Sequence, residues 1–425
     1  MTLSPARVPD AGAGSGSAVR QLTATLYGYA FLDDFVLLYP VYALLFADSG
    51  LTVWQISSLF ALWSITGVFL EVPSGAWADS VSRRTLLWLA PLLTATGFAL
   101  WVTVPSYGAF ALGFVLWGAG GALSSGAREA LVYDELDRLG AADRYARVMG
   151  RARAVGLLAV MAAMALAGPV FALGGYPAVG TASVLACLLG AATATRFQEH
   201  RVPKAADDDG ESKSDGKSSG CGGSGGGGGG WTVSLRGGLA ECRENRSVRR
   251  ALLLVPAVAA VWGALDEYTP LLIRDTGVAD RTVPYLLLLV WAIVTAGSLL
   301  AGAAERLGTT GLAVLLAGGG LALAVGAATR TPAGLVLVGV AFGCFQLAEV
   351  LADVRLQHRI DETRRATLTS FASLGTEVVT VAVFGVYALI GTTAAHSTVF
   401  AVLAVPYLVT GLVLAARKRG AEARP

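Results

Sequence analysis

Residues 309–328 read TTGLAVLLAGGGLALAVGAA and contain no charged side chain. The hydrocarbon core of a bilayer is about 30 Å thick, and a helix needs about 20 apolar residues to cross it. The stretch has this length and this composition, and it lacks the strict polar–apolar alternation of a barrel strand. It therefore predicts a membrane-spanning helix.

Similar apolar runs recur along the chain. Hydrophobic residues make up 54% of the 425 residues and charged residues only 15%, whereas soluble domains carry about 25% charged residues. This composition excludes a soluble enzyme and indicates an all-α integral membrane protein. We predict twelve transmembrane helices, at 20–47, 54–79, 84–104, 107–133, 147–173, 177–197, 249–273, 283–304, 309–328, 333–356, 366–391 and 396–416.

The polar segments divide the chain into five regions. Residues 20–197 and 249–416 are predicted to form two six-helix bundles. Residues 198–248 between them are polar and glycine-rich, so they cannot bury enough apolar surface to fold and are expected to form a flexible cytoplasmic linker. Residues 1–19 are expected to be a disordered cytoplasmic N-terminus, and residues 417–425 a cytoplasmic tail.

The distribution of basic residues predicts the orientation. Almost all of the 32 lysines and arginines fall on the side of the membrane where the N-terminus is predicted to lie, and the exceptions are Arg274, Arg281 and Arg330. Basic residues resist translocation, so this side is expected to be cytoplasmic, and an even number of spans places both termini there. The excess of arginine over lysine suggests a GC-rich bacterial genome, hence a multi-pass protein of the bacterial plasma membrane.

The two predicted bundles share sequence patterns. LDD at 32–34 in the first span matches LDE at 265–267 in the seventh. EAL at 129–131 in the fourth span matches EVL at 349–351 in the tenth. Matches in the same order and topological position indicate duplication of a six-helix unit, with the copies related by an axis along the membrane normal. This architecture predicts a substrate cavity between two pseudo-symmetric bundles.

Acidic residues inside the predicted spans are the main candidates for function. A charge at the bilayer centre costs at least about 2.5–3.5 kcal/mol, so these acids must face the bundle interior or water. Arg128 is the clear base at similar depth, and an acid-rich interior suits proton coupling or a cationic substrate. The candidates for substrate binding and proton coupling are Asp33, Asp34, Arg128, Glu129, Asp266, Glu267, Glu349, Asp353 and Glu377.

A second interpretation applies to the charged residues near helix ends. Arg128, Glu129, Asp353 and Arg355 could instead form cytoplasmic salt bridges that lock one conformation. A further intramembrane acid, Glu71, lies in the second span.

Several kinds of chemistry have no signature in the sequence. There is no GxxxxGK[ST] loop for a nucleotide, no cysteine–histidine spacing typical of a metal site, and no nucleophile–base constellation. We therefore expect no enzyme activity, no metal, no cofactor and no nucleic acid partner.

The segment from Gly75 to Arg84, GAWADSVSRR, lies between the second and third predicted spans. It resembles the signature GxLADRxGRR of the major facilitator superfamily, which occupies the same place in that family. The resemblance implies that Gly75, Asp79, Arg83 and Arg84 form a cytoplasmic gate motif. In that family the acid of this loop caps the cytoplasmic start of the eleventh helix, and the arginines add contacts that hold the inner side shut.

The fifth span ends with Gly168-Pro169 and then Gly174-Gly175. This resembles the GPxxGG motif of proton-linked exporters, although the spacing is two residues longer, and a kink without a transport role is the alternative. The resemblance implies a monomeric secondary transporter that exports a small organic compound, a drug or secondary metabolite, driven by the proton gradient. The alternatives are a nutrient importer or facilitator of the same fold and a membrane receptor that does not transport.

Overall fold

The computed structural model describes residues 11–200, 246–300, 307–358 and 365–422, with the backbone alone for residues 11–15, 71–80, 246–247, 250, 365–367 and 417–422. Its described residues form helices and no strands. The helices of the N-terminal half are α1 (Ala11–Asp34), α2 (Tyr42–Asp48), α3 (Val53–Ser80), α4 (Arg83–Thr103), α5 (Tyr107–Arg138) and α6 (Tyr145–Ala194). Those of the C-terminal half are α8 (Arg246–Arg274), α9 (Val283–Leu299), α11 (Thr309–Ala328), α12 (Gly334–Gln357), α13 (Arg365–Gly391), α14 (His396–Leu403) and α15 (Val405–Glu422).

Ten helices in the described residues are long and apolar enough to cross a membrane. One of them, α6, contains two predicted spans, because Gly174 and Gly175 interrupt it with non-helical backbone. Gly175 has φ +60°, a conformation that glycine adopts without a steric penalty. The remaining predicted span, the first, is divided between α1 and α2. The predicted all-α fold with twelve crossings is thus confirmed.

The division of the first span has a clear cause in the sequence. Pro40 lies between α1 and α2, and proline has no N–H to continue a helix. The break frees backbone donors in a buried region, and the N–H of Leu38 donates to Ser183 Oγ on α6 at 3.0 Å. The break therefore leaves Asp33 and Asp34 at the carboxyl end of α1.

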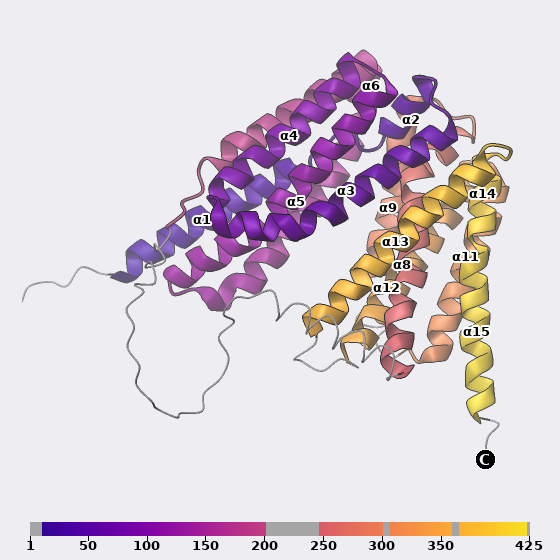
Figure 1. The fold of residues 1–425 in the computed structure, drawn as a ribbon. Helices are drawn as coiled ribbons and strands as arrows, with labels where there is room; N and C mark the ends of the chain where they lie inside the picture. The colour runs from indigo at the N-terminus through magenta and orange to yellow at the C-terminus, as the bar shows by residue number, and fades with distance from the viewer. Residues whose placement is uncertain (1–10, 201–245, 301–306, 359–364, 423–425) are drawn as a thin grey trace, which may run out of the picture.

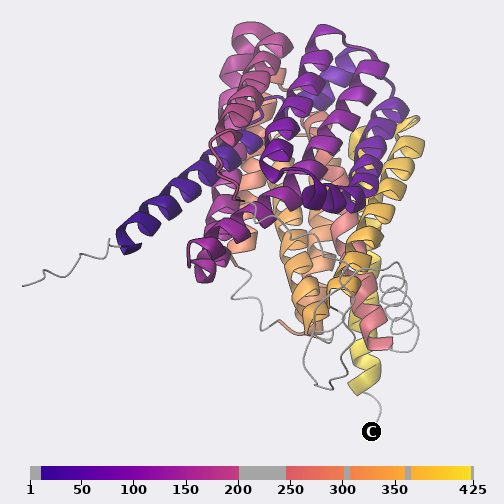
Figure 2. The same cartoon turned by 60° about the vertical axis from the view of Figure 1, so that its left-hand side comes forward.

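Some boundaries differ from the prediction. α1 begins at Ala11, inside the segment 1–19 that was expected to be disordered, and α15 continues to Glu422 in the expected tail. A helix gains one backbone hydrogen bond for each residue added, so it extends past the apolar run. Figure 2 shows the start of α1 projecting away from the other helices. Residues 201–245 of the predicted linker lie outside the described residues.

The two halves repeat the same helix pairings. α4 packs on α5 as α11 packs on α12, and α3 packs on α5 as α9 packs on α12. Likewise, α4 packs on α6 as α11 packs on α15, and α1 packs on α6 as α8 packs on α13. These equivalent pairings show the pseudo-symmetry that the sequence repeats predict.

One pairing breaks this symmetry. In the C-terminal half α8 packs closely against α12, whereas the equivalent helices α1 and α5 have almost no close backbone contact. A space lined by side chains is therefore left between α1 and α5.

The halves meet through α3 with α13, α6 with α9, and α2 with α8. Figure 1 shows them close together near α2 and α14 and diverging toward the end from which the C-terminus projects. We call the end where the two halves lie close together the Asp48 end, because α2 ends there at Asp48. We call the end where the halves diverge the Arg83 end, because α4 begins there at Arg83.

Candidate transport site

The space between α1 and α5 is a cavity of about 310 Å³. α1 contributes Asp33 and Asp34 to its wall, α5 contributes Trp117 and Ser124, and α9 of the other half contributes Trp291. Its other lining residues come from α1 and α5 themselves, from α4 and α6, and from the break after α1. The cavity thus combines carboxylates with large aromatic surfaces, and we call it the α1–α5 cavity.

Asp33 has a basic partner in this cavity. Arg128 Nη1 on α5 lies 3.4 Å from Asp33 Oδ2, and both side chains are partly exposed. Arg128 Nε is buried and has no hydrogen-bond partner among the described residues. The Arg128 guanidinium is therefore only partly satisfied by Asp33.

Asp34 differs from its neighbour, because no hydrogen bond or ion pair to its carboxylate occurs within the described part of the chain. The residue is exposed and lines the α1–α5 cavity. Its carboxylate lies close against α6, where a Cβ atom on Gly156 would come within 2.1 Å of Asp34 Oδ2. An alanine at position 156 would therefore displace the Asp34 carboxylate from its present place.

Of the corresponding acids in the seventh span, Asp266 contacts the other half. Tyr39 Oη, in the break after α1, donates to Asp266 Oδ2 on α8 at 3.2 Å. The neighbouring Glu267 has no hydrogen bond or ion pair in the part of the chain that is described. The Tyr39–Asp266 hydrogen bond joins the two halves beside the α1–α5 cavity.

The acids of the tenth span are placed differently. Trp262 Nε1 on α8 donates to Glu349 Oε2 on α12 at 3.0 Å, within the C-terminal half. Asp353, one turn further along α12, is exposed. Arg355 donates to the carbonyl oxygen of Leu307 at 2.8 Å. Glu349 thus joins α12 to α8, where the backbones pack more closely than those of α1 and α5.

Glu129 is exposed on α5, and no ion pair with it occurs in the described residues. Its neighbour Arg128 pairs with Asp33 instead. The described contacts of Arg128 therefore lie inside the bundle and not in a bridge at the helix end.

Glu377 lies in a second cavity, of about 300 Å³, between α3, α5 and α13. Glu377 is the described lining residue that belongs to the C-terminal half. The other described lining residues, which include Trp63 and Ser125, belong to the N-terminal half. Trp117 and Gly121 line both cavities, so the two spaces adjoin at α5. Glu377 and Asp34 are thus associated with neighbouring openings.

The start of α4 is held by a residue that follows the sixth span. Glu199 accepts hydrogen bonds from the backbone N–H groups of Arg83 and Arg84 at 3.0 and 3.1 Å, and from the Ser82 hydroxyl. A carboxylate at this position is stabilised by the free N–H groups and partial positive charge of a helix N-terminus. Glu199 therefore fixes the segment after α6 to the start of α4.

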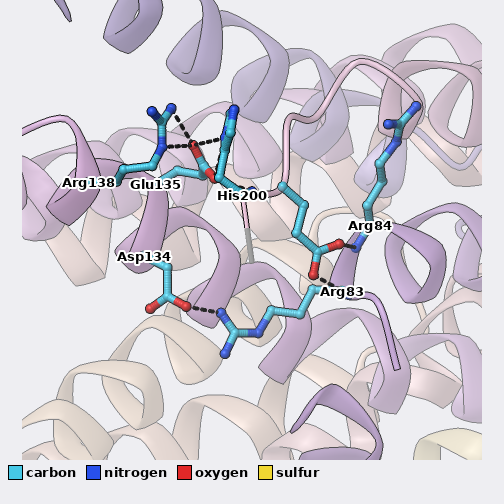
Figure 3. A network of polar contacts seen from close by, with 7 residues as sticks. Arg83, Arg84, Asp134, Glu135, Arg138 and His200 are labelled. Atoms are coloured by element: carbon cyan, nitrogen blue, oxygen red, sulfur yellow. Dashed lines mark hydrogen bonds and ion pairs between the residues drawn. The ribbon is translucent and has the colours of Figure 1, made fainter. Parts of the chain in front are cut away.

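The side chains of the predicted gate motif that the structure describes contact their own half. Arg83 forms an ion pair with Asp134 on α5, and Arg84 Nη2 donates to the Thr195 carbonyl oxygen at 2.6 Å. Figure 3 shows the Arg83–Asp134 pair beside a second cluster, in which Glu135 accepts from Arg138 and contacts His200. The side chains at positions 71, 75 and 79, including the predicted Gly75 and Asp79, lie outside the described residues.

At the opposite end, an ion pair joins the halves. Arg274 Nη2 on α8 lies 2.6 Å from Asp48 Oδ1 on α2 and also pairs with Asp280 at 3.2 Å. Asp48 accepts in addition from Tyr176 Oη at 2.5 Å. Nearby, Tyr268 Oη on α8 donates to Ser57 Oγ on α3 at 2.6 Å. These contacts close the Asp48 end.

Comparison with known proteins identifies the family. Residues 23–379 match the sequence profile of the Major Facilitator Superfamily. The chain belongs to the major facilitator superfamily. The match confirms the resemblance drawn from the Gly75–Arg84 segment and makes this protein a multi-pass membrane transporter, not an enzyme. No functionally curated protein matches the chain.

Solved structures of several transporters have the same fold. The nucleoside transporter NupG is 13% identical, with a TM-score of 0.68 over 94% of this chain and 98% of that one. The D-xylose–proton symporter is 14% identical, with a TM-score of 0.63 over 93% and 96%. A bacterial homologue of the iron transporter ferroportin in an inward-facing state is 16% identical, with a TM-score of 0.62 over 94% and 97%. At these identities the likeness establishes the fold alone.

Several residues at these sites escaped the sequence-based predictions. Trp117 and Trp291 carry no charge and resemble ordinary buried aromatic residues in a sequence. Glu199 follows the sixth span in what was predicted to be linker, and its partners lie more than 100 positions earlier. Only the charge of Glu199, directly after an apolar run, could have suggested a helix-capping role.

Proposed function

We propose that this protein is a proton-coupled exporter of a small organic compound that works by alternating access. The observation that carries the proposal is the pair of acids in the α1–α5 cavity. Asp34 has no hydrogen-bond or ion-pair partner among the described residues, and Asp33 pairs with Arg128. A carboxylate inside the membrane is costly unless it serves an ion or substrate pathway. Carboxyls in such a cavity can exchange a proton with water or exchange it for a substrate.

In this proposal the Arg83 end faces the cytoplasm and the Asp48 end faces outward. The closed contacts of Asp48 with Arg274 and the diverging helices at the other end then describe an inward-facing state. The ferroportin homologue with the same fold was solved in an inward-facing state. Both termini would lie in the cytoplasm, and the protein would act as a monomer in the plasma membrane of a bacterium.

Switching between states would use the acids that join or adjoin the halves. Protonation of Asp34, Glu377 or Glu129 removes a negative charge from the wall of the passage, which lowers the cost of closing it away from water. The Tyr39–Asp266 hydrogen bond links this region to α8, and Glu267, Glu349 and Asp353 extend the acidic surface into the C-terminal half. The halves then rock around the cavity, as superfamily architecture allows.

The gate motif would act in the opposite state. When the Arg83 end closes, Asp79 would cap the start of α13, and Arg83 and Arg84 would exchange some contacts with their own half for contacts across it. The proton gradient would supply the energy, with no cofactor and no metal. Within the described residues no group of three or more metal-ligating side chains lies together.

The test is transport by purified protein in proteoliposomes under an imposed proton gradient. Candidate compounds come from a susceptibility screen in a host without its own efflux pumps, with and without this gene. We expect gradient-driven flux in the wild type, at least about tenfold less in Asp34→Asn and Glu377→Gln, and little change in Asp137→Asn on the exposed end of α5. Unchanged gradient dependence in both acid variants would remove these residues from the mechanism.

The runner-up function is proton-coupled import, because one structure with this fold is a D-xylose–proton symporter. Deleting the gene separates the directions: export predicts more retained compound in the cells, and import predicts less. Saturable binding with no flux in either direction would instead favour a receptor.

A further inference from the structure

The α1–α5 cavity has the composition of a binding site for a positively charged molecule. Its volume of about 310 Å³ is near the lower end of small-molecule sites, which span about 300–1,000 Å³. Among its charged lining residues are Asp33 and Asp34, and the described basic partner is Arg128. With the carboxyls ionised, these three groups sum to one negative charge. A single cationic group would neutralise the site, whereas an anion would meet like charge.

The aromatic walls select the kind of cation. Trp117 and Trp291 line the cavity from opposite halves of the protein, with Tyr39 between the α1 and α2 segments. A cation over the face of a tryptophan is attracted by the ring quadrupole, and more strongly where water is displaced. Trp117 is held by neighbouring rings, with centroids 5.4 Å from Trp63 and 6.1 Å from Phe114. Large fixed aromatic faces favour an organic cation over a hydrated metal ion.

Trp291 adds a donor to the wall of the cavity. Its indole Nε1 is buried and interacts with the Asp266 side chain, but the contact falls short of a full hydrogen bond among the described residues. Buried donors are normally fully paired. An occupant with an acceptor atom would complete the pairing of this donor. Trp291 is also the one described lining residue from the C-terminal half, so an occupant would touch both halves.

We propose that the α1–α5 cavity binds a monovalent organic cation with a flat aromatic body, with Asp34 as its counter-ion and Trp117 and Trp291 as its walls. This inference rests on the proposed function, because it names the substrate class of the same transporter. Asp34 takes the charge because Asp33 is already paired with Arg128. Gly156 leaves room for the Asp34 carboxylate at the wall of the cavity.

The test is equilibrium binding to the purified full-length protein in lipid nanodiscs, which needs no proton gradient. The probe is the fluorescent monocation 4-(4-dimethylaminostyryl)-N-methylpyridinium, and its unmethylated neutral analogue is the matched competitor. We expect saturable one-to-one binding that weakens at least about tenfold in Asp34→Asn. Asp34→Glu and the distant Asp137→Asn should stay within about threefold of wild type, and Trp117→Ala should weaken binding several-fold.

Each result decides the inference. Equal binding by Asp34→Asn, equal competition by the neutral analogue, or no saturable binding to wild-type protein would overturn it. Size-exclusion profiles and rescue by Asp34→Glu separate loss of the counter-ion from misfolding. Gradient-driven flux of a neutral compound without cation binding would overturn the cation inference and leave the proposed function standing. Saturable cation binding with no gradient-driven flux of any compound would overturn the proposed function and leave the cation inference standing.

Discussion

Arg274 on α8 forms an ion pair with Asp48 on α2 at 2.6 Å, so a charge from each half closes the same end of the molecule. About one-third of each side chain is exposed. Exposed pairs usually contribute about 0.2–1 kcal/mol, and Asp280 and Tyr176 add further hydrogen bonds to this pair. The ion pair is thus strong enough to bias a balance between conformations but not to prevent exchange.

Asp48→Asn should therefore shift the population toward the state that is open at the Asp48 end, by about fivefold for a loss of about 1 kcal/mol. Spin labels at Trp54→Cys and Thr393→Cys, in a background without other cysteines, would report the longer distance. These positions flank the close approach of Val53 to Gly391. The charge swap Asp48→Arg with Arg274→Asp should restore part of the shorter distance. No change in Asp48→Asn would show that the ion pair does not hold the halves together.

The packing of Asp34 against α6 gives a second prediction. A Cβ on Gly156 would lie 2.1 Å from Asp34 Oδ2, so Gly156→Ala must displace the carboxylate. The displaced atom is the end of an exposed, flexible side chain, so the displacement itself costs little, and alanine adds about 1 kcal/mol of helix propensity. We expect a folded protein with transport reduced nearly as far as in Asp34→Asn.

Gly150→Ala is the matched control for Gly156→Ala. It lies on the same helix, and a Cβ there would meet no atom within 4 Å. This variant should gain up to about 1 kcal/mol of stability and keep its transport rate. Equal transport rates in the two alanine variants would show that the position of Asp34 does not depend on Gly156.

The contact between Asp34 and Gly156 also illustrates what the sequence could and could not predict. Long apolar runs such as 309–328 determine spans directly, because the bilayer sets a length that local sequence alone must satisfy. Pro40 could have predicted the break after α1, since proline ends helices for a local reason. The contact of Asp34 with Gly156 depends on how two helices pack, and neither residue by itself predicts it.

The asymmetry between the halves was beyond prediction for the same reason. The repeats at 32–34 and 265–267 predict equivalent helices, and α1 and α8 are equivalent. The repeats give no indication that Trp262 and Glu349 would close the α8–α12 contact while α1 and α5 remain apart. The cavity arises from this difference in packing, which is a long-range property of the fold.

Glu199 gives a third prediction, on stability. Its carboxylate accepts from two backbone N–H groups at the start of α4, so Glu199→Ala should lower stability by about 1–2 kcal/mol. Glu199→Gln keeps an acceptor and should lose about half as much. Thermal unfolding of the protein in nanodiscs measures both. The adjacent exposed Gln198→Ala should leave the melting temperature unchanged, and an equal loss in Gln198→Ala and Glu199→Ala would contradict the capping role.

The hydrogen bond from Tyr39 to Asp266 supports a fourth prediction, on coupling between the halves. Tyr39→Phe removes the donor and keeps the ring, and Asp266→Asn removes the charge and keeps the shape. If the bond at 3.2 Å stabilises this state, the two variants should be non-additive by about 0.5–1.5 kcal/mol. The quantity to measure is the open-to-closed population ratio from the spin-label pair at positions 54 and 393.

Tyr29→Phe provides the control pair for this cycle. Tyr29 donates to the Leu87 carbonyl oxygen at 3.1 Å, entirely within the N-terminal half. Its loss should lower stability without changing the effect of Asp266→Asn, because the two residues share no partner. Additive effects of Tyr39→Phe and Asp266→Asn would mean that their hydrogen bond does not distinguish the two conformations. Coupling confined to the Tyr39 pair would place the link between the halves at this bond, directly beside the acidic cavity.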